Sequence, residues 1–469
     1  MRRDLWMVPV GLLLGAALLL VAPAGATAQQ TDAEEAGCDR LSTWAGPFAS
    51  AEQFGEWIDG IKHPAPWLEL YGDIRLREIF APNLLLDQTD RHFQRYRFRV
   101  GAKVSPLEDI DFNVRLVYEP RHYCQPDDFE VWQMSEAIID KLNVEWRNFL
   151  GMPLTITAGR QDIILGDGWL VLDGTPLDGS RTIFFDAIRG TLDMPDLQSK
   201  LDVIYVCNSA DSDRLSPACD KDFHNHEQDE QGAIVYLTNN SMEDTQVDGY
   251  FIYKHDEAVL GNGTTGDIYT FGGRMVRKLD ENWRYNAQGA YQFGNKDGRD
   301  LCAFGFKGGV SYWMNDDWNN NFRVNYEYLS GDRHEPGSSR TTQFDPLWGR
   351  WPQFSELYVY PIALENRPGE ISNLHRINIG WSFNPVERME ICADYHVLFA
   401  DQNQVGLANP NISNDGYCRG QLVSGLLKYK FNDYVSTHLL GELFFPGDYY
   451  TDIRNEVAGF FRYEIMFTW

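Results

Sequence analysis

Basic side chains at every second position are the feature of this sequence that could do chemistry. Arg95, Arg97 and Arg99 follow one another in this way. In an extended chain, residues two apart project from the same face, roughly 7 Å from each other. A planar guanidinium group matches a carboxylate with two parallel hydrogen bonds. The pattern therefore predicts an anion-binding surface, formed by basic residues in three consecutive segments: Arg75, Arg77, Arg95, Arg97, Arg99, Lys103 and Arg115.

The segments that carry these residues alternate between apolar and polar side chains. In the last one, Phe461, Tyr463 and Ile465 share one parity, whereas Arg462 and Glu464 occupy the other. A period of two is typical of a β-strand with one apolar and one polar face. The same alternation predicts strands at residues 68–79, 93–105, 110–119, 134–148, 153–165, 181–194, 199–207, 231–238, 244–254, 267–279, 282–294, 303–313, 320–330, 373–384, 388–399, 419–431, 434–445 and 457–469.

The connections between these segments are short at one end and long at the other. Residues 280–281 and 432–433 form short turns, whereas 208–230, 331–372 and 400–418 form long loops. Strands long enough to cross a bilayer, aromatic residues near the strand ends and loops at one end only are typical of outer-membrane barrels. The alternative, a soluble β-sandwich, would bury its apolar faces in a core. We predict an all-β fold, a transmembrane antiparallel β-barrel of about 18 strands with short periplasmic turns and long extracellular loops.

A barrel of that size encloses an aqueous lumen rather than a side-chain-filled interior. The basic residues have the parity opposite to the apolar ones, so we expect them to line the lumen on three neighbouring strands. Such a wall attracts anions and lets them pass from one cation to the next. In the alternative reading, these cations pair with Asp73, Asp111, Glu119 and other acids of the lumen and only stiffen the wall. The two arrangements can coexist.

The N-terminal region is predicted to be a signal peptide, residues 1–28. Arg2 and Arg3 precede a continuous apolar stretch at 12–21, and the small residues at 26–28 form a cleavage motif. Residues 29–66 then form a periplasmic N-terminal segment, with a helix-like pattern at 51–61 that tethers the chain end or caps the periplasmic mouth; we favour the tether. Residues 67–469 form the barrel. The predicted location is the cell outer membrane of a Gram-negative bacterium.

The composition excludes several classes of protein. A net charge of −27 argues against nucleic-acid binding, and 14% aromatic residues argue against disorder. Seven cysteines in 469 residues are too few for a disulfide scaffold, although Cys207 and Cys219 flank a polar stretch and could form one disulfide. The sequence shows neither zinc-ligand spacing nor a phosphate-binding glycine loop, so we predict no metal and no cofactor.

An outer-membrane lipase-type enzyme is the alternative from a different functional class. Such an enzyme needs a serine, a histidine and an acid or amide on the lipid-facing side near the outer girdle. His396 and His438 both have inward parity, and no serine on a lipid face is positioned beside either. We therefore predict that the protein is not an enzyme.

The loop 331–372 is long for a connection between two strands. It contains five prolines and the aromatic residues Trp348, Trp351 and Phe354. Loops of this length are usually functional, so we expect it to fold over or into the channel, where it could act as a gate.

The chain resembles the alginate-export family of outer-membrane barrels. The resemblance rests on RYRFRVGAKV at 95–104, GRQDIILGDG at 159–168, YEYLSGD at 326–332 and FDPLWG at 344–349. It implies an eighteen-stranded barrel whose arginine-lined pore passes an anionic uronate polysaccharide outward. By the same resemblance, a pore role falls on Arg95, Arg97, Arg99, Arg160 and Arg189.

Two features depart from the family pattern. Arg160 shares the parity of Ile156 and Ala158, which directs it towards lipid unless Gly159 creates a bulge. The segment 166–181 is also more apolar than the family implies. An anion-preferring channel is therefore the safer description, and a general diffusion or structural porin without substrate specificity is the alternative. The expected partners are outer-membrane lipids and an anionic saccharide or small anionic solute, and no nucleic acid is expected. Periplasmic export components are a further possible class of partner that the sequence does not identify.

Overall fold

The computed structural model describes residues 51–126, 132–133, 137–172, 184–210, 227–350, 352–365 and 370–469. The chain divides into two units, residues 1–70 with Trp469, and residues 71–468. In the first unit, helix α2 (Ala51–Lys62) confirms the helix predicted at 51–61, and Ile58 is its buried apolar residue. The predicted signal peptide lies outside the described residues. Among the described residues, no helix is long and apolar enough to span a membrane.

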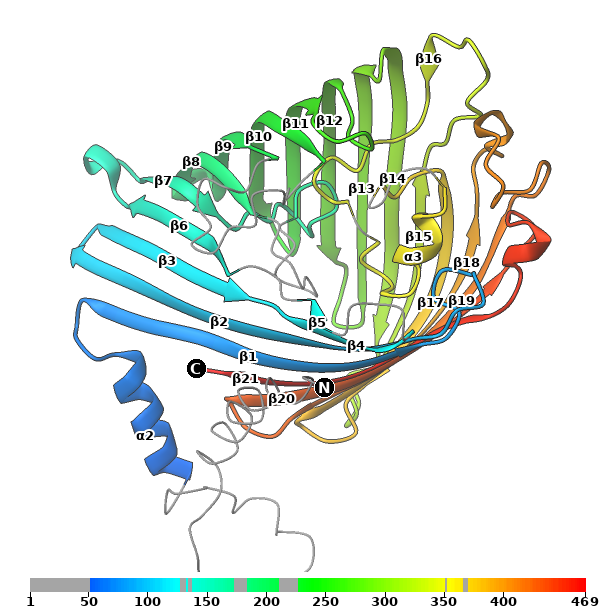
Figure 1. Ribbon diagram of the computed structural model, residues 1–469. Coiled ribbons are helices and arrows are strands. Elements are labelled where there is room, and N and C mark those ends of the chain that lie inside the picture. The colour runs from blue at the N-terminus through cyan, green and yellow to red at the C-terminus, as the bar shows by residue number, and fades with distance from the viewer. Residues whose placement is uncertain are drawn as a thin grey trace, which may run out of the picture. The chain divides into compact units, whose positions relative to one another are not determined.

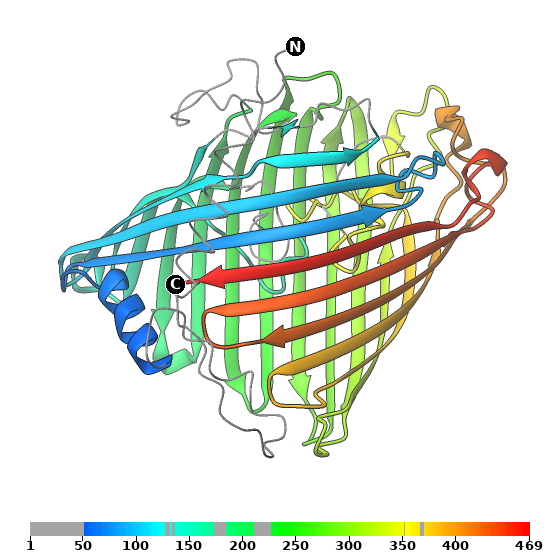
Figure 2. The ribbon, with the colours of Figure 1, turned by 60° about the horizontal axis from the view of Figure 1, so that its bottom comes forward.

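The second unit is a closed antiparallel β-barrel of 18 strands. Strand β1 pairs with β21 from Asp73 opposite Thr468 to Phe80 opposite Phe461, which closes the wall (Figure 2). The barrel strands are β1 (Leu68–Ala81), β2 (Arg91–Leu107), β3 (Ile110–Tyr118), β6 (Ile138–Trp146), β7 (Leu154–Gln161), β8 (Phe185–Met194), β9 (Ser199–Asn208), β10 (Gln228–Met242), β11 (Thr245–Ala258), β12 (Gly266–Lys278), β13 (Trp283–Lys296), β14 (Arg299–Trp313), β15 (Asn321–Leu329), β17 (Leu374–Phe383), β18 (Met389–Phe399), β19 (Cys418–Lys430), β20 (Val435–Pro446) and β21 (Ala458–Thr468).

Each of the eighteen predicted segments overlaps one of these barrel strands, with ends that differ by up to several residues. Three short strands in the same sheet were not predicted: β4 (Arg121–Gln125), β5 (Trp132–Gln133) and β16 (Arg340–Thr341). They lie within loops, where a pairing of two to five residues leaves too little sequence for a period of two to be visible.

The apolar face of the strands is the outer one. Phe461 and Tyr463 are 44% and 47% exposed, whereas Arg462 and Glu464 between and beside them are 7% and 6% exposed. In a soluble sandwich the apolar residues would be the buried ones. Exposed apolar side chains around a closed wall are instead what a hydrocarbon surrounding requires. The predicted orientation of the two faces is confirmed.

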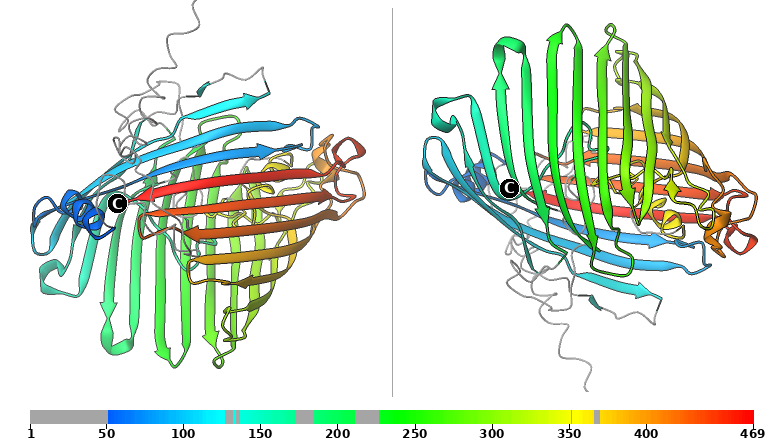
Figure 3. Two further views of the ribbon diagram at one scale, coloured as in Figure 1. Left: turned by 90° about the horizontal axis from the view of Figure 1, so that it is seen from below. Right: turned by 90° about the horizontal axis from the view of Figure 1, so that it is seen from above.

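The interior is more filled than the size of the barrel predicts. The loop 331–372, which includes the short helix α3 (Val359–Ile362), folds inward, as Figures 1 and 3 show for the segment in yellow. Its residues Phe344, Trp348 and Leu357 are buried in one cluster with inward side chains of the strands, such as Phe185. The prediction that this loop folds over or into the channel is confirmed; Trp351 lies outside the described residues.

The disulfide considered between Cys207 and Cys219 involves a residue outside the described part of the chain, so it stays an untested possibility. Cys207 itself lies on β9. Val203, Tyr205 and Cys207 are all exposed on the outer face, so the thiol points away from the loop that it was expected to close.

Candidate functional site

Strands β1, β2 and β3 place the predicted cations side by side on the inner wall. These strands are neighbours in the sheet, and β2 and β3 run in register from Phe98 opposite Tyr118 to Val104 opposite Phe112. Val100 on the outer face of β2 is 57% exposed, whereas Arg97 is 4% exposed. The alternation thus brings the basic residues of all three strands to the same side, as predicted.

Most of these cations form ion pairs within the wall. Asp73 accepts hydrogen bonds from Arg97 Nε at 2.9 Å and from Arg99 Nε at 2.5 Å. Lys103 Nζ lies 3.0 Å from Asp111, and Arg75 Nη2 lies 2.8 Å from Glu119. The ion pairs with these three acids that the alternative reading predicted are therefore present in the structure. Each pair lowers the positive potential of the wall and holds its side chains in place.

Other acids, from β21, from β6 and from the residue after β7, complete the network. Arg77 pairs with Glu464, which reaches it because β21 closes the barrel against β1. Arg115 pairs with Asp140 and Asp162, each at 2.9 Å. Sequence reasoning missed these acids, although the inward parity of Glu464 was a signal that could have identified it.

Arg95 differs from the other cations of the wall. It forms no ion pair with any described residue, and its buried Nε has no hydrogen-bond partner. Its electrostatic neighbours are Arg121, Glu119, Arg75 and Tyr360, the last of which lies on the inward-folded loop. Two cations against one carboxylate leave the positive charge of Arg95 uncompensated.

Arg189 and Arg160 lie further around the wall, on β8 and β7. Arg189 Nε donates to Asp202 at 2.8 Å. Arg160 donates to both carboxylate oxygens of Asp186, at 2.9 and 3.0 Å, and its guanidinium carbon lies 3.6 Å from the centre of the Phe184 ring. Both arginines are therefore held by acids of adjacent strands.

The bulge that would turn Arg160 towards the lumen does not form. The pairing of β7 with β6 and β8 stays regular through Gly159, and Arg160 lies opposite Leu142, which is exposed on the outer face. Arg160 keeps the outward parity, yet its side chain is buried beneath Phe184. A pore role for Arg160 stays a prediction without support from its position.

The inward-folded loop is bound to the wall by polar contacts that the sequence did not reveal. Lys296 Nζ lies 2.7 Å from Asp345 Oδ2, and Trp348 Nε1 donates to Glu230 at 2.9 Å. Burial by itself would lower the pKa of Arg350 on this loop, but Glu230 and Glu227 outweigh burial and raise it. The loop is thus anchored by charge as well as by its aromatic residues.

The histidines considered for an enzyme lie on the inner side, as their parity predicted. His396 is buried beside Arg376, and His438 accepts a hydrogen bond from Arg462 at 2.8 Å. In the part of the chain that the structure describes, no group of three or more His, Cys, Asp or Glu side chains is placed to hold a metal ion.

Comparison with known proteins extends these observations. A family model described as alginate export matches residues 87–462. No curated protein matches the chain. Three similar solved structures each align with 85% of this chain. OccK5 (OpdH) of Pseudomonas aeruginosa has a TM-score of 0.53 and 8% sequence identity, with 97% of its own chain covered. OpdQ of Pseudomonas aeruginosa and OccAB2 of Acinetobacter baumannii both have a TM-score of 0.55 and 98% of their own chains covered, with 12% and 10% identity respectively. These neighbours are outer-membrane porins, and at such low identity they show the fold alone.

Proposed function

The chain belongs to the alginate export family and forms an outer-membrane channel, and from this premise we propose that the channel passes anionic solutes, among them a uronate-type polysaccharide that leaves the cell. The proposal places the selectivity on the inner wall formed by β1, β2 and β3.

The uncompensated charge of Arg95 is the observation that carries the proposal. Its neighbours on the same strand, Arg97 and Arg99, share Asp73 between them, and Glu119, the carboxylate near Arg95, is already bound to Arg75. A polyanion is attracted to such a surplus. The acids of the wall keep each contact weak, which allows the chain of charges to move on rather than to stay bound.

A general diffusion porin without substrate specificity is the second candidate. The observation that favours it is the extent of ion pairing, because Arg75, Lys103 and Arg115 all have carboxylates within 3.0 Å. If those pairs dominated the potential of the lumen, the channel would pass small solutes of either charge.

The ion selectivity of single channels distinguishes the two candidates. Reversal potentials in planar bilayers under a salt gradient are expected to show anion preference for the parent protein. Arg95→Gln should reduce the anion-to-cation permeability ratio several-fold, on the order of the 1 kcal/mol that one screened charge contributes. The control is Arg277→Gln, since Arg277 is an exposed arginine near the end of β12. A cation-selective parent, or an Arg95→Gln channel with the parent's ratio, would contradict the proposal.

A further inference from the structure

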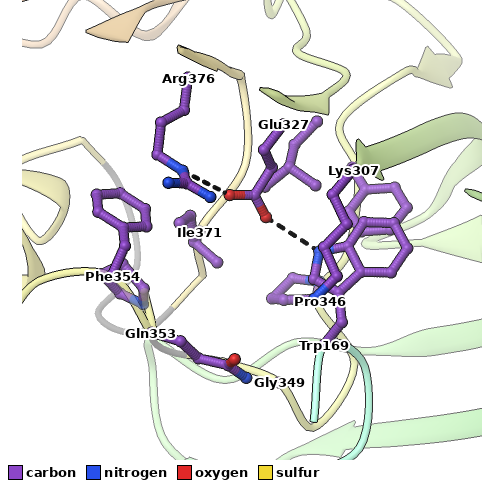
Figure 4. A pocket seen from close by; sticks show the side chains of 12 residues that line it. Trp169, Lys307, Glu327, Pro346, Gly349, Gln353, Phe354, Ile371 and Arg376 are labelled. Atoms are coloured by element: carbon purple, nitrogen blue, oxygen red, sulfur yellow. Dashed lines mark hydrogen bonds and ion pairs between the residues drawn. The ribbon is translucent and has the colours of Figure 1, made fainter. Parts of the chain in front are cut away.

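A cavity lies away from β1, β2 and β3, between the inward-folded loop and strands β14, β15 and β17. Its volume is about 170 Å³ (Figure 4). The loop contributes Phe344 and Phe354, the wall contributes Glu327 and Arg376, and Trp169 comes from the segment after β7. A volume below that of drug-sized pockets suits one small unit of a larger molecule.

Flat aromatic surfaces form the apolar part of the cavity. The Trp169 ring stacks on Phe344 with 5.6 Å between ring centroids and 21° between planes. The Phe354 ring lies across the cavity from Trp169 in Figure 4, with the guanidinium carbon of Arg376 4.4 Å from its centre. The face of an aromatic ring is electron-rich and attracts polarised C–H groups. The C–H face of a pyranose ring is such a surface.

The polar groups of the cavity are balanced in charge. Glu327 accepts hydrogen bonds from Arg376 Nε at 2.9 Å and from Trp169 Nε1 at 3.1 Å. Lys307 Nζ pairs with Asp167 at 2.6 Å. Each cation thus has its own carboxylate, in contrast to Arg95. An ionised carboxylate has about four acceptor positions, so both acids keep capacity for further donors such as hydroxyl groups.

The rim of the cavity is open to solvent. Gln353 lines the cavity and is exposed, and Asp167, which pairs with the lining residue Lys307, has a side chain that is 44% exposed. Gln353 Nε2 donates to Gly168 O at 2.6 Å, which joins the loop to the segment that carries Trp169. A ligand can therefore reach the aromatic faces past an amide and a carboxylate, both of which bind hydroxyl groups.

We propose that this cavity binds one pyranose unit of a saccharide, through the C–H face of the ring and its hydroxyl groups rather than through its charge. The inference rests on the proposed function in that it needs a saccharide in the channel. It adds that the channel recognises sugar rings at a site separate from the basic wall, and that neutral and acidic rings bind there alike.

Interruption of the single-channel current by saccharides tests this site. The probes are a neutral glucose trisaccharide and a uronate trisaccharide, each titrated in planar bilayers at high salt. Both should interrupt the current of the parent. Phe354→Leu removes the flat face while it keeps the bulk, and should raise both half-blocking concentrations about three- to tenfold. Phe354→Tyr, which keeps the flat aromatic face, should have the half-blocking concentrations of the parent.

Phe304→Leu is the matched control, because Phe304 is an exposed phenylalanine on the outer face of β14; its channels should block like the parent. If Phe354→Leu gives no channels, Gln353→Ala at the exposed rim should weaken both blocks instead. A parent that neither trisaccharide blocks, or that only the uronate blocks in a salt-sensitive manner, would overturn the inference, as would equal blocking of Phe354→Leu and Phe304→Leu. Reversal potentials from the same bilayers test the anion selectivity of the proposed function, whereas the saccharide block tests this cavity. The two proposals can therefore be contradicted independently of each other.

Discussion

The ammonium group of Lys296, at the end of β13, lies 2.7 Å from Oδ2 of Asp345 and fastens the inward-folded loop to the barrel wall. Gln292 on the same strand holds the backbone of Asp345 from both sides, since it donates to the carbonyl at 2.7 Å and accepts from the N–H at 2.8 Å. Burial alone would raise the pKa of Asp345, but Lys296 and then Lys254 outweigh it and lower this pKa. The carboxylate therefore stays charged and bound to the wall.

Breaking this contact should loosen the loop and widen the passage. Lys296→Met leaves the buried carboxylates of Asp345 and Glu370 without their shared cation, a change that typically costs about 3–5 kcal/mol. We expect a higher single-channel conductance and more frequent switching between levels. Lys428→Met is the control, because its pair with Glu390 is exposed and such pairs contribute little. A conductance equal to that of the parent would show that the loop does not limit the flow of ions.

Gly159 is required by the backbone of β7. Its φ of +116° lies where residues with a side chain are strained, and a Cβ atom there would lie 2.3 Å from Leu142 O. Gly159→Ala should therefore destabilise the folded barrel by at least about 1–3 kcal/mol, measured by urea titration of folding into vesicles. Gly425→Ala should have little effect, since nothing lies within 4 Å of the added atom. Equal unfolding midpoints for the two variants would contradict this role of Gly159.

The outward face of the wall should not tolerate charge. Val324 on β15 is 55% exposed on the apolar side, so Val324→Arg places a guanidinium group in the hydrocarbon. We expect a loss of about 2–4 kcal/mol in the free energy of folding into vesicles if the residue lies near the midplane. Leu197→Arg, at the exposed last residue of the short 3-10 helix Pro195–Leu197, should cost almost nothing. A soluble, detergent-free Val324→Arg protein with native stability would argue against the outer position of this face.

The barrel could be predicted from the sequence because its signal is local and repeated. Alternation such as that of Phe461, Arg462, Tyr463 and Glu464 indicates both a strand and its two faces, and the same alternation recurs in the other strands. Closure follows from the need to pair every backbone group in lipid. The alternative reading, in which Asp73, Asp111 and Glu119 pair with the basic wall, followed from the same signal, because these acids share the parity of the basic residues.

The filled interior could not be predicted in the same way. The contacts of Asp345 with Lys296 and of Trp348 with Glu230 join residues 49 and 118 positions apart, and no periodicity relates a loop to the wall behind it. The arrangement in which Arg97 and Arg99 share Asp73, while Arg95 has no ion pair with a described residue, also depends on side-chain geometry. Parity determines which side a residue faces but not which partner it meets.

The stability of the loop should depend on pH through His334. Burial lowers the pKa of this histidine below its usual value near 6.5; the carboxylate of Asp332 opposes the shift, and Arg299 adds to it. The folded state thus favours the neutral ring, while the unfolded chain binds a proton more readily. The contribution of His334 is complete above about pH 6.5 and is lost as the pH falls below that value towards the folded-state pKa. The groups that face the ring are Asp332, Arg299, Lys296, Gln343 and Gln404.

The difference between thermal unfolding midpoints at pH 7.5 and pH 5.5 measures this effect in detergent. Other titrating groups act equally in the parent and in His334→Gln, so the variant should lose less stability on acidification than the parent does. His63→Gln, at an exposed histidine just after α2, should behave like the parent. An acid-induced loss that is the same in all three proteins would show that the ring of His334 is not held neutral by its surroundings in the folded loop.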